Sequence, residues 1–181
     1  MLRFDKMTVK AQEALQSAQE IAARHENQQI EPIHLLAALV AQTDGVVPPL
    51  LARLGIRAEA LSQDIEREIA RLPRVTGFAQ QHMGKVLNDL LERAFDEAQR
   101  FKDEYVSTEH MFLAIAGQDR DPAGQLLKKH GASHEAIYWR RFPRHDRRAR
   151  SGQHRGRASL SLVQGSGARK KALHSDRYRT T

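Results

Sequence analysis

Apolar residues recur at spacings of three and four along most of residues 8–138, which is the pattern of amphipathic α-helices. The first predicted helix begins at about Thr8 and carries an alanine-rich apolar stripe. Proline is tolerated in the first turn of a helix, so Pro32, Pro48 and Pro122 mark further predicted helix starts. Because no segment alternates apolar and polar residues as a half-buried strand does, the sequence predicts an all-α fold.

The helical pattern occurs twice along the chain. Residues 10–61 align without a gap with residues 86–137, and each residue of the second copy lies 76 positions after its counterpart. Identical residues meet at several matched positions: His34 with His110, Gly55 with Gly131, Leu15 with Leu91, and Leu50-Leu51 with Leu126-Leu127. A repeat of this length indicates one supersecondary unit that is used twice.

The breaks between the predicted helices define the expected domain organisation. We expect two pseudo-symmetric four-helix repeats, at about residues 8–72 and about residues 84–138. Residues 73–83 begin with proline, soon reach a glycine and have no helical period, so they are expected to connect the repeats. The two repeats are expected to share one core and to form one compact domain, residues 1–138.

The composition changes abruptly at Trp139. Thirteen of the 29 Arg and Lys residues lie from Arg140 onward with only two of the 22 Asp and Glu residues, so the repeated part is mildly acidic although the chain carries +7. Residues 139–181 are rich in Arg, Ser and Gly without a helical period, and we expect a disordered basic tail. A frameshifted reading frame would produce such a switch. Sequencing the locus tests this hypothesis, which fails if the frame runs uninterrupted to Thr181 with no ATPase coding downstream in another frame.

The sequence also bears on the compartment in which the protein works. It contains no cysteine, so neither a disulfide framework nor a thiolate metal site is possible. The amino terminus has no apolar core of signal-peptide length, and no segment is long and uncharged enough to span a bilayer. We therefore expect a cytoplasmic protein without a membrane partner.

Several stretches of the first 137 residues resemble the amino-terminal domain of ClpB disaggregases, a Clp amino-terminal repeat domain. They are Asp5-Lys6-Met7-Thr8, Ile30-Glu31-Pro32-Ile33-His34-Leu35-Leu36, Leu50-Leu51-Ala52-Arg53-Leu54-Gly55, Leu72-Pro73-Arg74-Val75-Thr76-Gly77 and Asp103-Glu104-Tyr105-Val106-Ser107-Thr108-Glu109-His110. The resemblance implies a mobile, non-catalytic domain that binds exposed hydrophobic segments of unfolded or aggregated polypeptides and passes them to an ATP-driven ring. It further implies that Thr8, Asp103 and Glu109 contact the substrate, beside an apolar groove that includes Leu91.

The chain departs from the family pattern after Trp139. It contains no Gly-x-x-x-x-Gly-Lys-Ser/Thr sequence that would bind phosphates, so we expect no ATPase module here and no enzymatic activity. No carboxylate pair has a histidine or serine constellation beside it, and we predict no catalytic residue and no cofactor.

The histidines do not have the spacing of a metal site. His34 and His110 occupy the same place in both repeats, but neither has a His or Cys partner at helical spacing. We expect structural roles for them, such as an imidazole hydrogen-bonded near a helix start. Gly131 is expected to break the helix between His130 and His134, so we predict no zinc site.

Each candidate binding residue also has an ordinary structural interpretation. Thr8 precedes a helix and is expected to cap it, and Glu109 lies in a first turn, where the helix dipole favours an anion. Asp103 sits in a polar connector and could stabilise a turn. For Leu91, burial in the core is the default.

Two alternative functions stay open at this stage. A stand-alone domain of this kind could dock adaptor proteins or regulate full-length ClpB-type ring subunits, which makes these proteins candidate partners. The arginine run at residues 140–157 could attract nucleic acid through phosphate neutralisation. We do not expect nucleic-acid binding, because no base-reading arrangement accompanies the charge.

Overall fold

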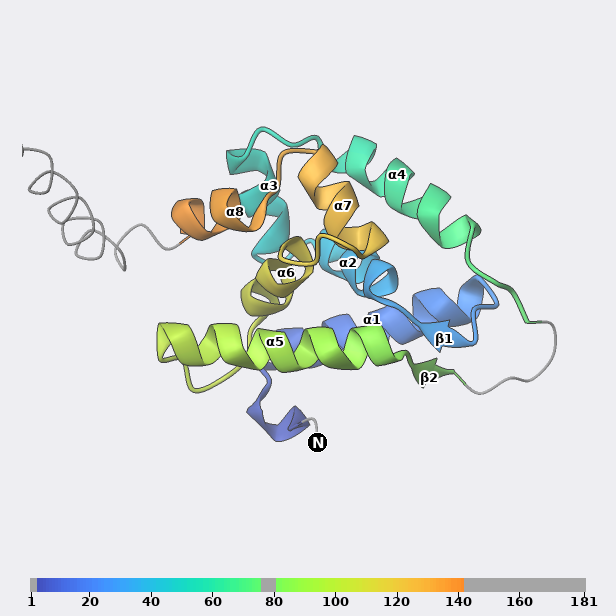
Figure 1. The fold of residues 1–181 in the computed structure, drawn as a ribbon, viewed down its shortest axis with the longest axis horizontal. Helices are drawn as coiled ribbons and strands as arrows, with labels where there is room; N and C mark the ends of the chain where they lie inside the picture. The colour runs from blue at the N-terminus through green and yellow to red at the C-terminus, as the bar shows by residue number, and fades with distance from the viewer. Residues whose placement is uncertain (1–2, 76–80, 142–181) are drawn as a thin grey trace, which may run out of the picture. The chain divides into compact units, whose positions relative to one another are not determined.

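The structure of the protein, a computed structural model, describes residues 3–75 and 81–141 (Figure 1). The first repeat begins with a short 3-10 helix, Phe4–Lys6. Its four α-helices are α1 (Val9–Arg24), α2 (Pro32–Ala41), α3 (Val47–Arg53) and α4 (Ala58–Ala70). The second repeat contains α5 (Lys85–Phe101), α6 (Thr108–Ala116), α7 (Pro122–Lys129) and α8 (His134–Arg141). The predicted all-α fold with two four-helix repeats is confirmed.

The two repeats break their helices at matching positions. The long helices α1 and α5 are each followed by a residue with positive φ, Glu26 and Lys102. In both copies the next amide donates back into the helix, from Asn27 to the Ala22 carbonyl in the first repeat, at 2.9 Å. Reversal of the chain after α1 and α5 is therefore fixed by the same C-terminal hydrogen-bonded turn.

Short parallel pairings join the repeats to one another. Strand β1 (Gln29–Ile30) pairs with β2 (His82–Met83), which brings Ile30 opposite Met83. The isolated bridge between Met7 and Val106 is the equivalent pairing with the repeats exchanged. At the 76-residue offset, Met7 corresponds to Met83 and Val106 corresponds to Ile30. We call the pairing around Ile30 and Met83 the first junction and the pairing around Met7 and Val106 the second junction. In each repeat, the residues before the long helix thus pair with the residues after the long helix of the other repeat.

The core lies between the repeats. In Figure 1, α2 and α6 lie between the long helices α1 and α5 on one side and α3, α4, α7 and α8 on the other. Helices α2 and α6 are buried over nearly their whole length, and beyond the first turn both are apolar on all sides, as burial requires. Burial of this shared centre fixes the two repeats as one domain.

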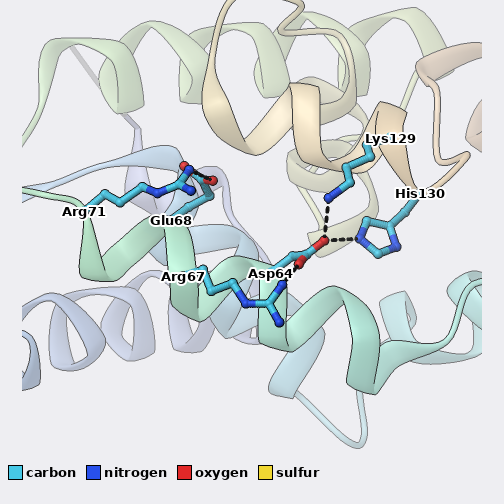
Figure 2. A network of polar contacts seen from close by, with 6 residues as sticks. All are labelled: Asp64, Arg67, Glu68, Arg71, Lys129 and His130. Carbon is cyan, nitrogen blue, oxygen red and sulfur yellow. Dashed lines mark hydrogen bonds and ion pairs between the residues drawn. The ribbon is translucent and has the colours of Figure 1, made fainter.

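A polar network ties α4 to the end of α7 at the domain surface (Figure 2). The Asp64 carboxylate accepts from Lys129 Nζ and from His130 Nε2, both at 3.0 Å, and from Arg67 at 2.6 Å. Hydrogen bonds from Lys129 and His130 lower the pKa of Asp64 to about 2. The network therefore holds a charged carboxylate where the two repeats meet.

Helix α8 runs three residues past the expected end of the domain at residue 138. It continues through Arg141, and Trp139 Nε1 donates to Glu135 Oε1 one turn earlier, at 3.3 Å. The remainder of the expected tail, residues 142–181, lies outside the described residues. No helix among residues 3–75 and 81–141 has the length and apolar character needed to cross a membrane.

Candidate functional site

The second junction brings together three of the four predicted binding residues. Thr8 donates its amide to the Val106 carbonyl at 2.9 Å, and Val106 donates in turn to the Lys6 carbonyl at 2.8 Å. Asp103 and Glu109 stand three residues before and after Val106, in the connecting loop and in the first turn of α6. Residues far apart in sequence therefore flank a single backbone bridge.

Thr8 caps helix α1, as the sequence predicts. Its backbone is extended, and its Oγ1 accepts from the Ala11 amide at 3.2 Å. One of the four free amides of the first turn is satisfied in this way. The capping role accounts for a hydroxyl residue here, and the predicted contact of Thr8 with a substrate stays a prediction.

Asp103 faces the buried His110. The ring Nδ1 of His110 accepts from the Ser107 amide at 3.0 Å, so the proton of the neutral ring lies on Nε2. Nε2 is 3.2 Å from Asp103 Oδ2, but among the described residues it has no partner with hydrogen-bond geometry. We therefore regard the pair as an electrostatic contact. The Asp103 side chain is half exposed and can also turn to an outside ligand.

Burial and charge act in opposite directions on His110. Removal of the ring from water lowers its pKa, and the carboxylates of Asp103 and Glu109 oppose this shift. Glu109 is partly buried, and its Oε2 accepts from Ser107 Oγ at 2.6 Å. The negative charge at this junction therefore interacts with the histidine as well as with solvent.

Two large side chains are exposed in the segments that contain Met7 and Val106. Phe4 is 45% exposed and Tyr105 is 46% exposed, and the Lys6 ammonium lies 5.2 Å from the Tyr105 ring centroid. Phe4 also lines a groove of about 290 Å³ along α1 that includes Ile30 and Met83 of the first junction, so Tyr105 is the exposed aromatic residue of the second junction. The exposure of Phe4 and Tyr105 cannot be predicted from the sequence, because periodicity does not distinguish an exposed aromatic residue from a core one.

Leu91 does not belong to this surface. Its side chain is fully buried in the shared core, on the inward side of α5. The expectation that Leu91 lines an open groove is therefore wrong for this conformation. The physical reason is that the apolar stripe of α5 is covered by α6.

The first junction carries the matching residues in a closed arrangement. His34 Nδ1 accepts from the Glu31 amide at 2.9 Å, and His34 Nε2 donates to Asn27 Oδ1 at 3.0 Å. Asn27 is buried and donates to the Pro73 carbonyl at 3.0 Å. Burial, followed by the charge of His25, lowers the pKa of His34 to about 4. The structural role expected for both histidines is confirmed.

The remaining histidines do not form a metal site in the described part of the chain. Gly131 has a positive φ and separates His130, which contacts Asp64, from His134, whose Nε2 lies 3.2 Å from Glu97 Oε1. Within residues 3–75 and 81–141, no three His, Asp or Glu side chains are grouped so that they could hold a metal ion.

Comparisons with known sequences all indicate the same family. Residues 6–130 match the sequence profile of the Clp repeat (R) N-terminal domain. The chain is 38% identical over 141 residues to the chaperone protein ClpB of Clostridium perfringens, covering 75% of this chain and 16% of that protein. The ClpB protein of Bdellovibrio bacteriovorus is 39% identical over 132 residues, covering 72% of this chain and 15% of that protein. The chain thus spans about one sixth of the length of these relatives.

Solved structures show the same fold. The N-terminal domain of ClpV1 from Escherichia coli superposes with a TM-score of 0.66 at 21% identity, covering 77% of this chain and 85% of that one. The Hsp104 N-terminal domain from Candida albicans gives a TM-score of 0.62 at 23% identity, with coverages of 73% and 86%. A ClpV N-domain solved in complex with a VipB peptide gives 0.60 at 18% identity, with coverages of 74% and 82%.

Proposed function

The chain belongs to the family of Clp repeat N-terminal domains, and from this premise we propose that it is a non-catalytic polypeptide-binding domain. In this proposal it captures exposed hydrophobic segments of unfolded or aggregated proteins for a ClpB-type disaggregase. The second junction is the proposed binding surface, with Thr8, Asp103 and Glu109 around it. Leu91 is left out, because the core covers it.

The observation that carries the proposal is the combination of one exposed aromatic ring, Tyr105, with the carboxylates of Asp103 and Glu109 at one backbone bridge. Tyr105 keeps nearly half of its surface in water although most of its side chain is apolar. Exposed aromatic side chains that can be desolvated supply much of the binding energy at protein interfaces. The carboxylates of Asp103 and Glu109 would favour segments that carry positive charge near an apolar residue. Binding should therefore weaken as salt is added.

The two repeats provide a matched experiment for this surface. Tyr105 and Gln29 occupy equivalent positions, one at each junction, and both are exposed. We expect Tyr105→Ala to weaken binding of a permanently unfolded, fluorescently labelled polypeptide by about fivefold, since a truncated aromatic anchor typically costs 1 kcal/mol or more. Gln29→Ala is the control and should bind as the unmodified chain does. Fluorescence anisotropy with the full chain measures both affinities.

The outcome of this titration can contradict the proposal. If Tyr105→Ala and Glu109→Gln both fold and both bind the unfolded polypeptide with unchanged affinity, the second junction is not the binding surface. Circular dichroism of each variant shows whether the helices are retained. An affinity that does not respond to salt would argue against the part assigned to the carboxylates.

A second candidate function is the docking of a specific adaptor protein. It is favoured by the ClpV N-domain solved in complex with a VipB peptide, which has the same fold as this chain. Docking of an adaptor predicts saturable binding of one folded partner and little binding of unrelated unfolded chains. Competition between an unfolded polypeptide and a candidate adaptor for the Tyr105 surface separates the two functions. Binding of nucleic acid through the tail concerns residues outside the described part of the chain.

A further inference from the structure

The second junction already holds a cation that belongs to the chain itself. The Lys6 ammonium donates to Glu104 Oε1 at 3.2 Å and lies 5.2 Å from the centroid of the Tyr105 ring. A carboxylate and the face of an aromatic ring both attract a cationic side chain. We call Glu104 and Tyr105 together the cation subsite. The function proposed above assigns no role to Glu104 or to Lys6.

Both groups of the cation subsite can be reached from solvent. The Glu104 side chain is 70% exposed, and its second carboxylate oxygen has no partner among the described residues. Nearly half of Tyr105 is also exposed. A cationic side chain of another molecule can therefore reach the same two groups that Lys6 contacts.

The backbone fixes Lys6 beside this subsite. The Lys6 carbonyl accepts from the Val106 amide at 2.8 Å, and the Val106 carbonyl accepts from the Thr8 amide at 2.9 Å. Lys6 thus binds the subsite within the same molecule, at an effective concentration that the ligand does not change. Its contacts are weak, because solvent screens an exposed ion pair. A better ligand can therefore displace the Lys6 side chain without breaking the backbone bridge.

Comparison of the repeats shows that the fold does not need these contacts. The three residues correspond at the 76-residue offset to three different ones: Lys6 to His82, Glu104 to Gln28, and Tyr105 to Gln29. The first junction forms the equivalent backbone pairing without a carboxylate or an aromatic ring in the places of Glu104 and Tyr105. The cation subsite therefore belongs to the second junction alone, where the proposed binding surface lies.

An arginine side chain fits this subsite better than Lys6 does. A planar guanidinium donates two parallel hydrogen bonds to one carboxylate and also stacks on an aromatic face, whereas an ammonium is a compact point charge. Lys6 bonds to only one oxygen of Glu104, so the other oxygen is free for the second bond. An arginine thus gains a contact that the internal lysine does not make.

We propose that the cation subsite binds an arginine side chain of a client polypeptide, and that Lys6 is an internal competitor which this arginine displaces. The inference rests on the proposed function, because it defines the substrate class of the same surface as apolar segments that carry an arginine. A client without arginine leaves Lys6 in place and gains only the remaining apolar contacts. Lys6 therefore contributes to the selectivity of the second junction.

A pair of peptides tests the recognition of arginine. Two short unstructured peptides with the same apolar sequence carry either arginine or citrulline at the centre, and citrulline has nearly the same shape without the charge. With the full chain, we expect the arginine peptide to bind about threefold more tightly. In Lys6→Met this ratio should rise to about tenfold, because the competitor is removed. Fluorescence anisotropy of the labelled peptides measures both affinities.

Two further variants separate displacement of Lys6 from a general change in charge. Lys102→Met removes a positive charge from an exposed residue next to Asp103 that has no contact with the subsite, and should leave the ratio at about threefold. Glu104→Gln should lower the ratio, because a neutral amide does not attract the guanidinium group. In the double variant Lys6→Met/Glu104→Gln, the gain from Lys6→Met should disappear. Circular dichroism shows whether each variant keeps its helices.

The readouts separate this inference from the proposed function. The inference is overturned if Lys6→Met leaves the ratio unchanged, if Lys102→Met raises it equally, or if Glu104→Gln keeps the full preference for arginine. The proposed function fails instead if Tyr105→Ala leaves the affinity for the citrulline peptide unchanged. The ratio of the two affinities therefore tests the cation subsite, and the affinity for the uncharged peptide tests the second junction.

Discussion

The two junctions are built on the same plan, and at one matched position an amide, Asn27, is replaced by a carboxylate, Asp103. At the first junction, Asn27 accepts from His34 and donates to the Pro73 carbonyl, and it is almost fully buried. At the second junction, Asp103 takes the same place beside His110, but it cannot donate and half of its side chain is exposed. The Asn27 amide thus hydrogen-bonds to the connection between the repeats and closes the first junction. The Asp103 carboxylate cannot donate such a bond and stays half exposed, which leaves the second junction open to solvent.

This difference shows how a duplicated unit can divide its tasks. The first junction satisfies its polar groups internally and so contributes to stability. The second junction leaves carboxylates and the Tyr105 ring at the surface and so is available to a partner. Glu97 and Ile21 show a similar contrast on the long helices, because the second repeat again carries a charge where the first carries an uncharged residue. At the second junction, the divergence between the copies marks the candidate site.

The largest expected effect comes from removing the amide that closes the first junction. Asn27→Ala leaves the ring Nε2 of His34 and the Pro73 carbonyl without their partner, and we expect a loss of about 3–4 kcal/mol in unfolding free energy. Asp103→Ala at the equivalent position should cost less than about 1 kcal/mol, because the carboxylate is half exposed. Urea denaturation of both variants measures the difference. Equal losses would show that the junctions do not differ in the way described.

The second-largest expected effect is a loss of unfolding free energy in acid, caused by His34 at the first junction. His34 has a pKa of about 4 in the folded chain and an ordinary value of about 6.5 when unfolded, so between these values only the unfolded chain takes up the proton. Stability is therefore unaffected by His34 above about pH 6.5 and falls as the pH drops toward 4, by about 3 kcal/mol in total. NMR titration of the His34 ring and urea denaturation across this range check the prediction. A ring that titrates near pH 6.5 in the folded state would contradict it.

Asp103→Asn sharpens the same test at the second junction. The variant removes a carboxylate that opposes the lowering of the His110 pKa, so His110 should become harder to protonate and should resemble His34. The acid-dependent loss of stability should then be larger than in the unmodified chain. An unchanged titration of His110 would mean that Asp103 does not act on the ring.

Much of this architecture could be predicted from the sequence, because the period of three and four and the 76-residue offset report directly on helices and on their duplication. The structural role of His34 and His110 was also predictable, since metal ligands come in groups and each of these residues is alone in its segment. The paired strands were not predictable. A two-residue pairing such as Ile30 with Met83 leaves no alternating run in the sequence.

The candidate site is harder to predict from the sequence than the fold is, for a physical reason. Periodicity places Leu91 on an apolar face but does not say whether another helix covers that face, and here α6 does. The change in composition at Trp139 predicts that the tail begins there, yet the hydrogen bond of Trp139 to Glu135 continues the helix. In the sequence, Asp96-Glu97 looks like an ordinary charged pair on a helix, so nothing there predicts that Glu97 is buried. Only the burial of one of the two distinguishes them.

The helix caps at the two junctions give a smaller, testable difference. Thr8 caps α1 and Gly84 stands at the equivalent position before α5, without a capping side chain. We expect Thr8→Ala to lower the unfolding free energy by about 1 kcal/mol. Gly84→Ser should bring no matching gain, within about 0.5 kcal/mol, because a Cβ at Gly84 would lie 2.9 Å from Gln29 Nε2 and 3.0 Å from Glu31 Oε1. Thermal or urea denaturation measures the unfolding free energy of both variants. A gain of about 1 kcal/mol in Gly84→Ser would show that the two capping positions are equivalent.

The smallest expected effect tests whether the aromatic ring alone distinguishes the junctions. Gln29→Tyr places a ring at the first junction, at the position equivalent to Tyr105. We expect less than about a twofold gain in affinity for an unfolded polypeptide, because an anchor binds well only beside groups that complement the ligand. The first junction does not offer the exposed carboxylate of Asp103, since its counterpart Asn27 is neutral and buried. If Gln29→Tyr gained as much affinity as Tyr105→Ala loses, the difference in binding between the junctions would be due to the ring alone and not to the exposed carboxylate beside it.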